Sequence, residues 1–242
     1  MKTTSDFIKN GSHEEFLSVL QYYGDAIKMK ASQKKKNDEG LVQLDKWYQE
    51  DLEKLVRSRS PSHITRDELV RLMKWKLSRG KFRPRLVELA ASNSNESVKD
   101  ASAKGIRLAL GNKVEDAINA LDVLKGVGPA TASGILAACV PERCCFFADE
   151  VALAVLPVSS LKYNISEYQL LNATVVDIVN RLNKEIKTEN KEADDEHTWT
   201  PHKVELAIWT HAVILKNKPE LLSDFKRSAK ESTGSIKKRR LN

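Results

Sequence analysis

Apolar residues recur at intervals of three and four positions along most of the chain, and alternating β-branched runs are scarce. Such spacing is typical of amphipathic helices. Thr65 and Glu68 have the spacing of a capping box, which marks a helix that begins near Arg66. The fold class that we expect is all-α, with helices over 13–30, 41–59, 66–77, 84–91, 96–110, 114–124, 129–139, 150–156, 166–187 and 201–215.

The polar runs between these helices suggest three parts. We expect a helical extension over 1–44, a main helical domain over 45–220 and a disordered basic tail over 221–242. The chain of 242 residues is long enough for the main domain to bury a proper core.

Charge is distributed unevenly between the body and the tail. The net charge is +7, and residues 226–242 hold seven basic side chains against Glu231 alone, so the body carries only about +1. Global basicity is therefore no argument for nucleic-acid binding by the folded part. The cluster Lys237, Lys238, Arg239 and Arg240 resembles a nuclear localisation signal, which predicts a nuclear protein and an import receptor as a partner. A non-specific nucleic-acid-binding arm is the alternative.

Several classes of protein are disfavoured by composition. No apolar run approaches the roughly 20 residues that span a bilayer, and the N-terminus lacks the apolar region of a signal peptide, so no membrane partner is expected. Three cysteines make neither a disulfide framework nor a four-cysteine iron–sulfur site. We therefore expect no cofactor of that kind, and buried thiols in a reducing compartment.

Residues 121–135, LDVLKGVGPATASGI, are the most informative stretch. They read as an apolar helix end, a tight turn from Leu124 to Gly128, and a second helix that Pro129 opens. Small residues follow Pro129, so nothing bulky shields the start of that helix. Its free amides and positive dipole end favour an anion such as phosphate. An ordinary αα-hairpin with a glycine turn is the alternative.

This pattern resembles the helix-hairpin-helix motif, here at 114–139, which grips the backbone of double-stranded DNA. The resemblance implies that the amides of Gly126, Gly128 and Ala130 donate to phosphate. It also implies that the main-chain carbonyls of Leu124 and Val127 face a monovalent cation. The residues expected to contact DNA at the hairpin are Lys125, Gly126, Val127, Gly128, Ala130 and Thr131.

A second DNA-contact candidate precedes the hairpin. Residues 71–85, RLMKWKLSRGKFRPR, hold seven basic side chains and no acidic one, with Trp75 and Phe82 among them. Cations neutralise phosphates and aromatic rings stack on bases. We expect the part up to Leu77 to be a core helix with a solvated face. The following turn contributes the DNA-contact candidates Arg79, Lys81, Arg83 and Arg85.

Asp149 follows the apolar residues Phe146 to Ala148 and precedes another helix. The order of hairpin, helix, loop and aspartate resembles the helix-hairpin-helix DNA glycosylase superfamily, which implies that Asp149 is catalytic. A carboxylate beside a flipped-out nucleotide stabilises the oxocarbenium-like sugar and orients water. The alternative is that Asp149 is a plain helix N-cap. Members that also cleave the strand have a lysine where Ala130 stands here, so the resemblance implies a monofunctional enzyme.

A closer resemblance covers roughly Asp45 to Leu215. The segments ELVRLMKWKLSRGKFRPRL, LKGVGPATASGILAA, CFFADEVA and WTPHKVELAIWTHAV are similar to the Amun-like family, a eukaryotic group with a glycosylase-like domain and nuclear association. The function expected from these resemblances is nuclear DNA binding, with base excision by a monomer. Two alternatives stay open: a non-catalytic DNA-binding or chromatin-associated protein that keeps the fold, and a protein-interaction scaffold with a merely structural hairpin.

Overall fold

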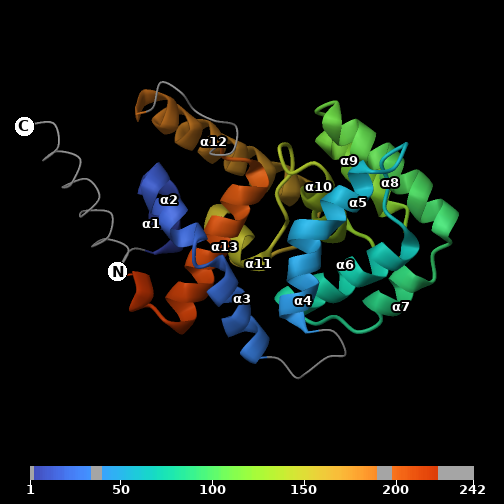
Figure 1. Ribbon diagram of the computed structural model, residues 1–242, viewed down its shortest axis with the longest axis horizontal. Helices are drawn as coiled ribbons and strands as arrows, with labels where there is room; N and C mark the ends of the chain where they lie inside the picture. Colours follow the sequence, from blue (N-terminus) through green and yellow to red (C-terminus); the bar gives the residue numbers. More distant parts are fainter. Residues whose placement is uncertain (1–2, 34–39, 190–197, 223–242) are drawn as a thin grey trace, which may run out of the picture.

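A computed structural model describes residues 3–33, 40–189 and 198–222. Within these ranges the chain forms α-helices and one π-helical turn, and no strand (Figure 1). The prediction of an all-α protein is confirmed for this part of the chain. The expected tail lies almost wholly outside the described residues, as do the signal residues Lys237, Lys238, Arg239 and Arg240.

Most helices agree with the expected spans to within two residues. Their bounds are α1 Thr4–Asn10, α2 His13–Leu20, α3 Tyr23–Ser32, α4 Leu41–Lys46, the π-helical turn η1 Trp47–Asp51, α5 Leu52–Arg57, α6 Arg66–Arg79, α7 Leu86–Ala91, α8 Asn95–Leu110, α9 Val114–Asp122, α10 Pro129–Cys139, α11 Asp149–Val155, α12 Ile165–Glu189 and α13 Pro201–Asn217.

Two spans differ from expectation. The helix expected over 13–30 is divided between α2 and α3, and the one expected over 41–59 is interrupted by η1. Helix α1 was not expected; it begins at a capping box in which the Thr3 side chain and Asp6 bond each other's backbone amide. The capping box predicted at Thr65 is confirmed, because its side chain accepts from the Glu68 amide and the Glu68 carboxylate accepts from the Thr65 amide.

Helix α13 lies at the centre of one half of the molecule, where α1, α2, α3, α11 and α12 pack around it (Figure 1). Helices α8 and α9 pair at the other end, and α10 connects the two regions because it contacts α12 and α13 as well as α5, α6, α8 and α9. Every residue of α10 after Pro129 is buried. The small residues that make this helix narrow therefore let it pass through the core.

The N-terminal helices share this core. Phe7 stacks on Phe16 with ring centroids 4.2 Å apart, and on the His211 ring of α13 at 4.4 Å. The Tyr23 hydroxyl donates to Asp45 Oδ1 at 2.7 Å, across the boundary that we drew at residue 44. That division of the chain stays a prediction. In the described part of the chain, no helix is long and apolar enough to cross a bilayer.

The three thiols give a testable consequence of this packing. Cys139, Cys144 and Cys145 are all buried and free, and burial raises the pKa of each, to about 12 for Cys144. Because the thiolate is the reactive form, we expect no reaction with Ellman's reagent at about pH 8 in the folded protein. After unfolding in guanidinium, all three should react within the mixing time. Rapid labelling of the folded protein would contradict this packing.

Candidate functional site

A cavity of about 520 Å³ lies between the α9–α10 turn, the loop after α6 and the start of α11. This volume is in the usual range of small-molecule sites. The cavity brings together the hairpin residues, Asp149 and part of the basic segment, which are far apart in the sequence. Its lining residues are Lys76, Arg79, Gly80, Lys81, Arg83, Pro84, Leu86, Gly126, Gly128, Pro129, Ala130, Thr131, Phe146, Phe147, Ala148, Asp149, Glu150, Tyr163 and Trp209.

The turn of the hairpin requires glycine at one of its two glycine positions. Gly126 has φ +79°, in the left-handed region, and a Cβ there would lie 3.0 Å from Leu89 Cβ and 3.3 Å from the Ala90 nitrogen. A Cβ at Gly128 would meet only Asp122 Oδ1 at 3.8 Å. A glycine is therefore required at position 126, where the turn packs closely against α7, whereas the space beside Gly128 is open.

Asn93 fixes the turn from outside. Its Nδ2 donates to the Lys125 carbonyl at 3.0 Å, and its Oδ1 accepts from the Lys125 amide at 2.9 Å. The same side chain bonds the carbonyls of Leu89 and Ala90, so it ties the turn to the end of α7. Sequence reasoning missed this residue, because an asparagine in a polar turn gives no sign of a partner some thirty positions away.

The three amides expected to bind phosphate have no partner in the described part of the chain: those of Gly126, Gly128 and Ala130. Two neighbouring amides are already used, since Val127 donates to the Leu124 carbonyl at 3.1 Å and Thr131 to the Gly128 carbonyl at 2.9 Å. Any contact of Val127 or Thr131 with DNA must therefore come from other atoms. The monovalent cation at the Leu124 and Val127 carbonyls stays a prediction.

Asp149 is the first residue of α11 rather than its cap. Ala148 occupies the N-cap position, and no side chain caps this helix. The alternative that Asp149 is a plain N-cap is therefore wrong. The residues before it are held to α10 by Ser133, whose hydroxyl accepts from the Phe147 amide at 3.0 Å and donates to the Ala130 carbonyl at 3.0 Å. One serine thus links the hairpin helix to the segment that carries the carboxylate.

Two residues hold the Asp149 carboxylate, which is one-fifth exposed at the cavity wall. The Tyr163 hydroxyl donates to its two oxygens at 3.0 and 3.1 Å, and Lys81 Nζ lies 3.4 Å from Oδ2. Tyr163 has φ +57°, a left-handed backbone conformation that residues other than glycine rarely adopt. The loop before α12 is therefore strained where it presents this hydroxyl to Asp149.

The basic segment divides into a buried and an exposed part. Lys81, Arg83 and Arg85 are exposed as expected, and Arg83 lies over the Tyr163 ring at 5.6 Å. Arg79 requires a correction. Helix α6 continues through it, its side chain is 1% exposed, and Nη1 binds Glu205 Oε1 at 3.0 Å. A guanidinium in this position cannot reach a phosphate on the surface.

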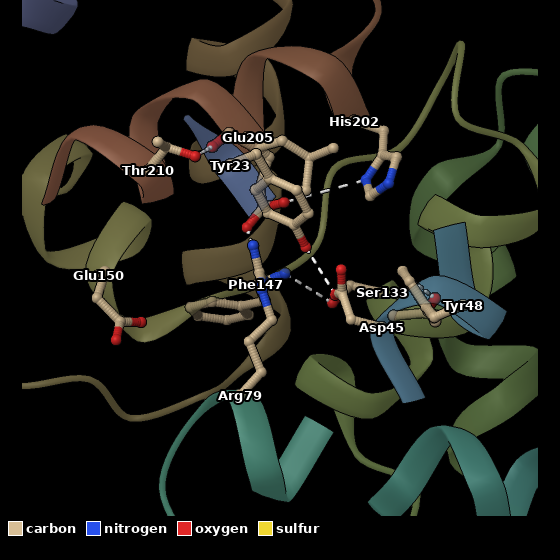
Figure 2. A network of polar contacts seen from close by, with 12 residues as sticks. Tyr23, Asp45, Tyr48, Arg79, Ser133, Phe147, Glu150, His202, Glu205 and Thr210 are labelled. Carbon is tan, nitrogen blue, oxygen red and sulfur yellow. Dashed lines mark hydrogen bonds and ion pairs between the residues drawn. The ribbon is translucent and has the colours of Figure 1, made fainter. Parts of the chain in front are cut away.

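Figure 2 shows Arg79 in a buried polar network beneath α13. Glu205 is 0% exposed and is the ion-pair partner of Arg79. The Asp45 carboxylate accepts from both the Tyr23 hydroxyl and the Trp75 indole. Burial raises the pKa of Glu205 to about 7, although the Arg79 guanidinium opposes the shift. Burial, with the Arg79 charge added, lowers the pKa of His202 to about 3, so its imidazole is neutral.

Two further charged groups, Lys76 and Glu150, line the cavity. Burial lowers the pKa of Lys76, an effect that Asp149 opposes and Arg83 reinforces. Burial also disfavours the charge on Glu150, but the Lys30 ammonium 2.9 Å away outweighs it and lowers the pKa of Glu150. Glu150 is thus paired with Lys30 of α3, whereas the Asp149 carboxylate accepts from the Tyr163 hydroxyl at the cavity. No cluster of His, Cys, Asp or Glu in the described ranges has the form of a metal site.

Comparisons with known proteins add no assignment. No family model matches the chain, and no curated protein or solved structure was found to match it. The function must therefore be argued from the cavity and the residues around it.

Proposed function

We propose that this protein binds double-stranded DNA through a helix-hairpin-helix glycosylase-like domain and excises a base as a monofunctional DNA glycosylase. One observation carries the proposal: a single cavity is lined by the hairpin turn, a held carboxylate and two exposed cations. A DNA strand lying along the hairpin would have its phosphate at the free amides and a flipped nucleotide in the cavity.

The hairpin supplies the anchor. The free amides of Gly126, Gly128 and Ala130 surround the first turn of α10, a helix of eleven residues whose dipole favours an anion at this end. Lys125 is exposed on the turn, and Lys81, Arg83 and Arg85 are exposed on the loop after α6. These cations favour the phosphates of a duplex.

Asp149 supplies the chemistry. When the bond between base and sugar lengthens, positive charge develops on the sugar, and a carboxylate beside it lowers the energy of that state. Tyr163 and Lys81 fix the direction of the carboxylate before the substrate arrives. The same oxygens can orient the attacking water. Ala130 stands where strand-cleaving members of the resembled superfamily have a lysine, so we propose base release without strand cleavage.

The basic residues Lys237, Lys238, Arg239 and Arg240 would be read by an import receptor and bring the protein to the nucleus. A monomer suffices for this chemistry, because the hairpin and Asp149 come from one chain.

The anchor is tested by two glycine variants. We expect Gly128→Ala to fold as the wild type does, since the added methyl meets only one atom at 3.8 Å, and to bind a duplex roughly tenfold more weakly because the methyl obstructs the phosphate. Gly126→Ala, at φ +79° and in contact with α7, should lose about 1–3 kcal/mol of unfolding free energy. Fluorescence anisotropy and urea denaturation measure the two effects.

Gly24→Ala is the matched control, because a Cβ at this helical position of α3 meets nothing within 4 Å. It should leave duplex binding unchanged. If Gly128→Ala binds DNA as tightly as the wild type, the hairpin is not the anchor. If the wild type binds no duplex at low salt, the proposed function itself is wrong, and the scaffold alternative takes its place.

A further inference from the structure

Phe82, in the loop between α6 and α7, carries an aromatic ring that is open to solvent. It is 73% exposed, and no other aromatic residue in the described ranges is exposed. A single exposed apolar side chain is common on protein surfaces, so exposure alone says little. The position of the ring and the charges around it decide what it can do.

The residues on either side of Phe82 attach the loop to the cavity. Lys81 Nζ lies 3.4 Å from Asp149 Oδ2, and the Arg83 guanidinium carbon lies 5.6 Å from the centroid of the Tyr163 ring. Lys81 and Arg83 line the cavity, whereas Phe82 does not. Because consecutive Cα atoms are only about 3.8 Å apart, the ring starts at the edge of the cavity and extends into solvent.

The loop is fastened at both ends. At its start, the Gly80 amide donates to the Lys76 carbonyl at 2.9 Å. At its end, Pro84 has a fixed φ, and the Arg85 carbonyl accepts from the Leu89 amide at 2.9 Å. A side chain on a loop that is already held loses little conformational freedom on binding, so more of its contact energy contributes to affinity.

The charge of the loop indicates the kind of partner that covers the ring. Residues 80–85 include three exposed cations and no acidic residue. The partner must therefore offer negative charge around a flat apolar surface. DNA has this combination, because phosphates surround bases whose faces stack on an aromatic ring. A protein partner would need an apolar pocket ringed by carboxylates, so the loop favours DNA.

Resting on the proposed function, we propose that Phe82 enters the base stack of the bound duplex beside the nucleotide that is flipped into the cavity. The ring fills the space that the base leaves and keeps the neighbouring base pairs apart. Insertion into an intact duplex requires unstacking, whereas a position that lacks its base offers the space already. Phe82 therefore makes the protein select duplexes in which stacking is interrupted.

The test compares two duplexes of one sequence with the full-length protein, one fully paired and one with a tetrahydrofuran abasic analogue. Fluorescence anisotropy should show the wild type binding the abasic duplex about tenfold more tightly. Phe82→Ser should lose this preference and bind the paired duplex within about twofold of the wild type, since the cations of the loop remain. Phe82→Trp should keep the preference, and the abasic duplex should quench its added tryptophan emission more strongly than the paired one does.

Val123→Ser is the matched control, because Val123 is 75% exposed and immediately precedes the hairpin turn but lies outside the basic loop. It should keep the preference for the abasic duplex. Equal affinity of the wild type for the two duplexes, or equal weakening of both in Phe82→Ser, would overturn the inference and leave the proposed function in place. Wild-type affinities in Phe82→Ser would do the same and assign the ring to a protein partner. Failure of the wild type to bind either duplex at low salt would overturn the proposed function, and the inference with it.

Discussion

Glu205→Ala is expected to lower the free energy of unfolding by about 3–5 kcal/mol, the largest stability effect of any single change that we consider. The variant leaves the Arg79 guanidinium buried with no counter-charge, and arginine does not escape the cost by losing its proton. Urea denaturation followed by circular dichroism, at about pH 8, measures the loss. At that pH the Glu205 carboxylate of the wild type is ionised, because its raised pKa is about 7.

A double variant separates the effect of the two charges from the effect of the volume that the side chains fill. Arg79→Met with Glu205→Leu removes both charges and keeps similar volume, and replacements of that kind are often neutral. We expect the double variant to be more stable than Glu205→Ala by about 2 kcal/mol or more. The exposed pair Lys28 and Asp25 is the control, since Asp25→Ala should have no measurable effect. A double variant as unstable as Glu205→Ala would show that packing, and not charge, sets the cost.

The helices could be predicted because their signals are local. The capping box of Thr65, the proline that opens α10 and the glycines of the turn each act within a few residues, and the structure has these helices where expected. Helix α2 was joined to α3 in the prediction because the apolar spacing continues through the break. The two residues at the break, Gln21 and Tyr22, are neither proline nor glycine, and Gly24 lies inside α3, so tertiary packing decides where the helix is interrupted.

Arg79 shows where local reasoning fails. Gly80 and Pro84 indicate a loop, and a basic residue beside a loop is usually solvated. Its partner Glu205 is 126 residues further along the chain, and nothing in either local sequence announces the pair. The same holds for Tyr163, which is the main partner of Asp149 but lies in a polar stretch that gives no sign of its position.

The cavity lies beyond what the sequence could show, because its wall comes from α6 and the loop after it, the hairpin, the start of α11, the Tyr163 loop and α13. Motif reasoning identified the hairpin and Asp149 separately. It could not show that they face one space. Packing brings these parts together, and the proposed chemistry depends on that packing.

Asp149→Asn is expected to lower base release by about 100-fold or more while duplex affinity stays within about twofold of the wild type. Asparagine has nearly the same shape and still accepts from the Tyr163 hydroxyl, so the wall of the cavity is kept. What it lacks is the negative charge that stabilises the sugar as the base departs. Single-turnover assays on a panel of duplexes that each carry one altered or mismatched base measure release, and anisotropy measures binding.

Glu150→Gln is the matched control, because Glu150 is the neighbouring carboxylate but is paired with Lys30 of α3. It should release the base at nearly the wild-type rate. If both variants lose release equally, general loss of local charge explains the effect, and Asp149 has no special role. If the wild type binds duplexes but releases no base from any of them, the carboxylate is a structural group held by Tyr163, and the protein is a DNA-binding module without glycosylase activity. A loss confined to Asp149→Asn is the result that the geometry of Tyr163, Lys81 and the cavity leads us to expect.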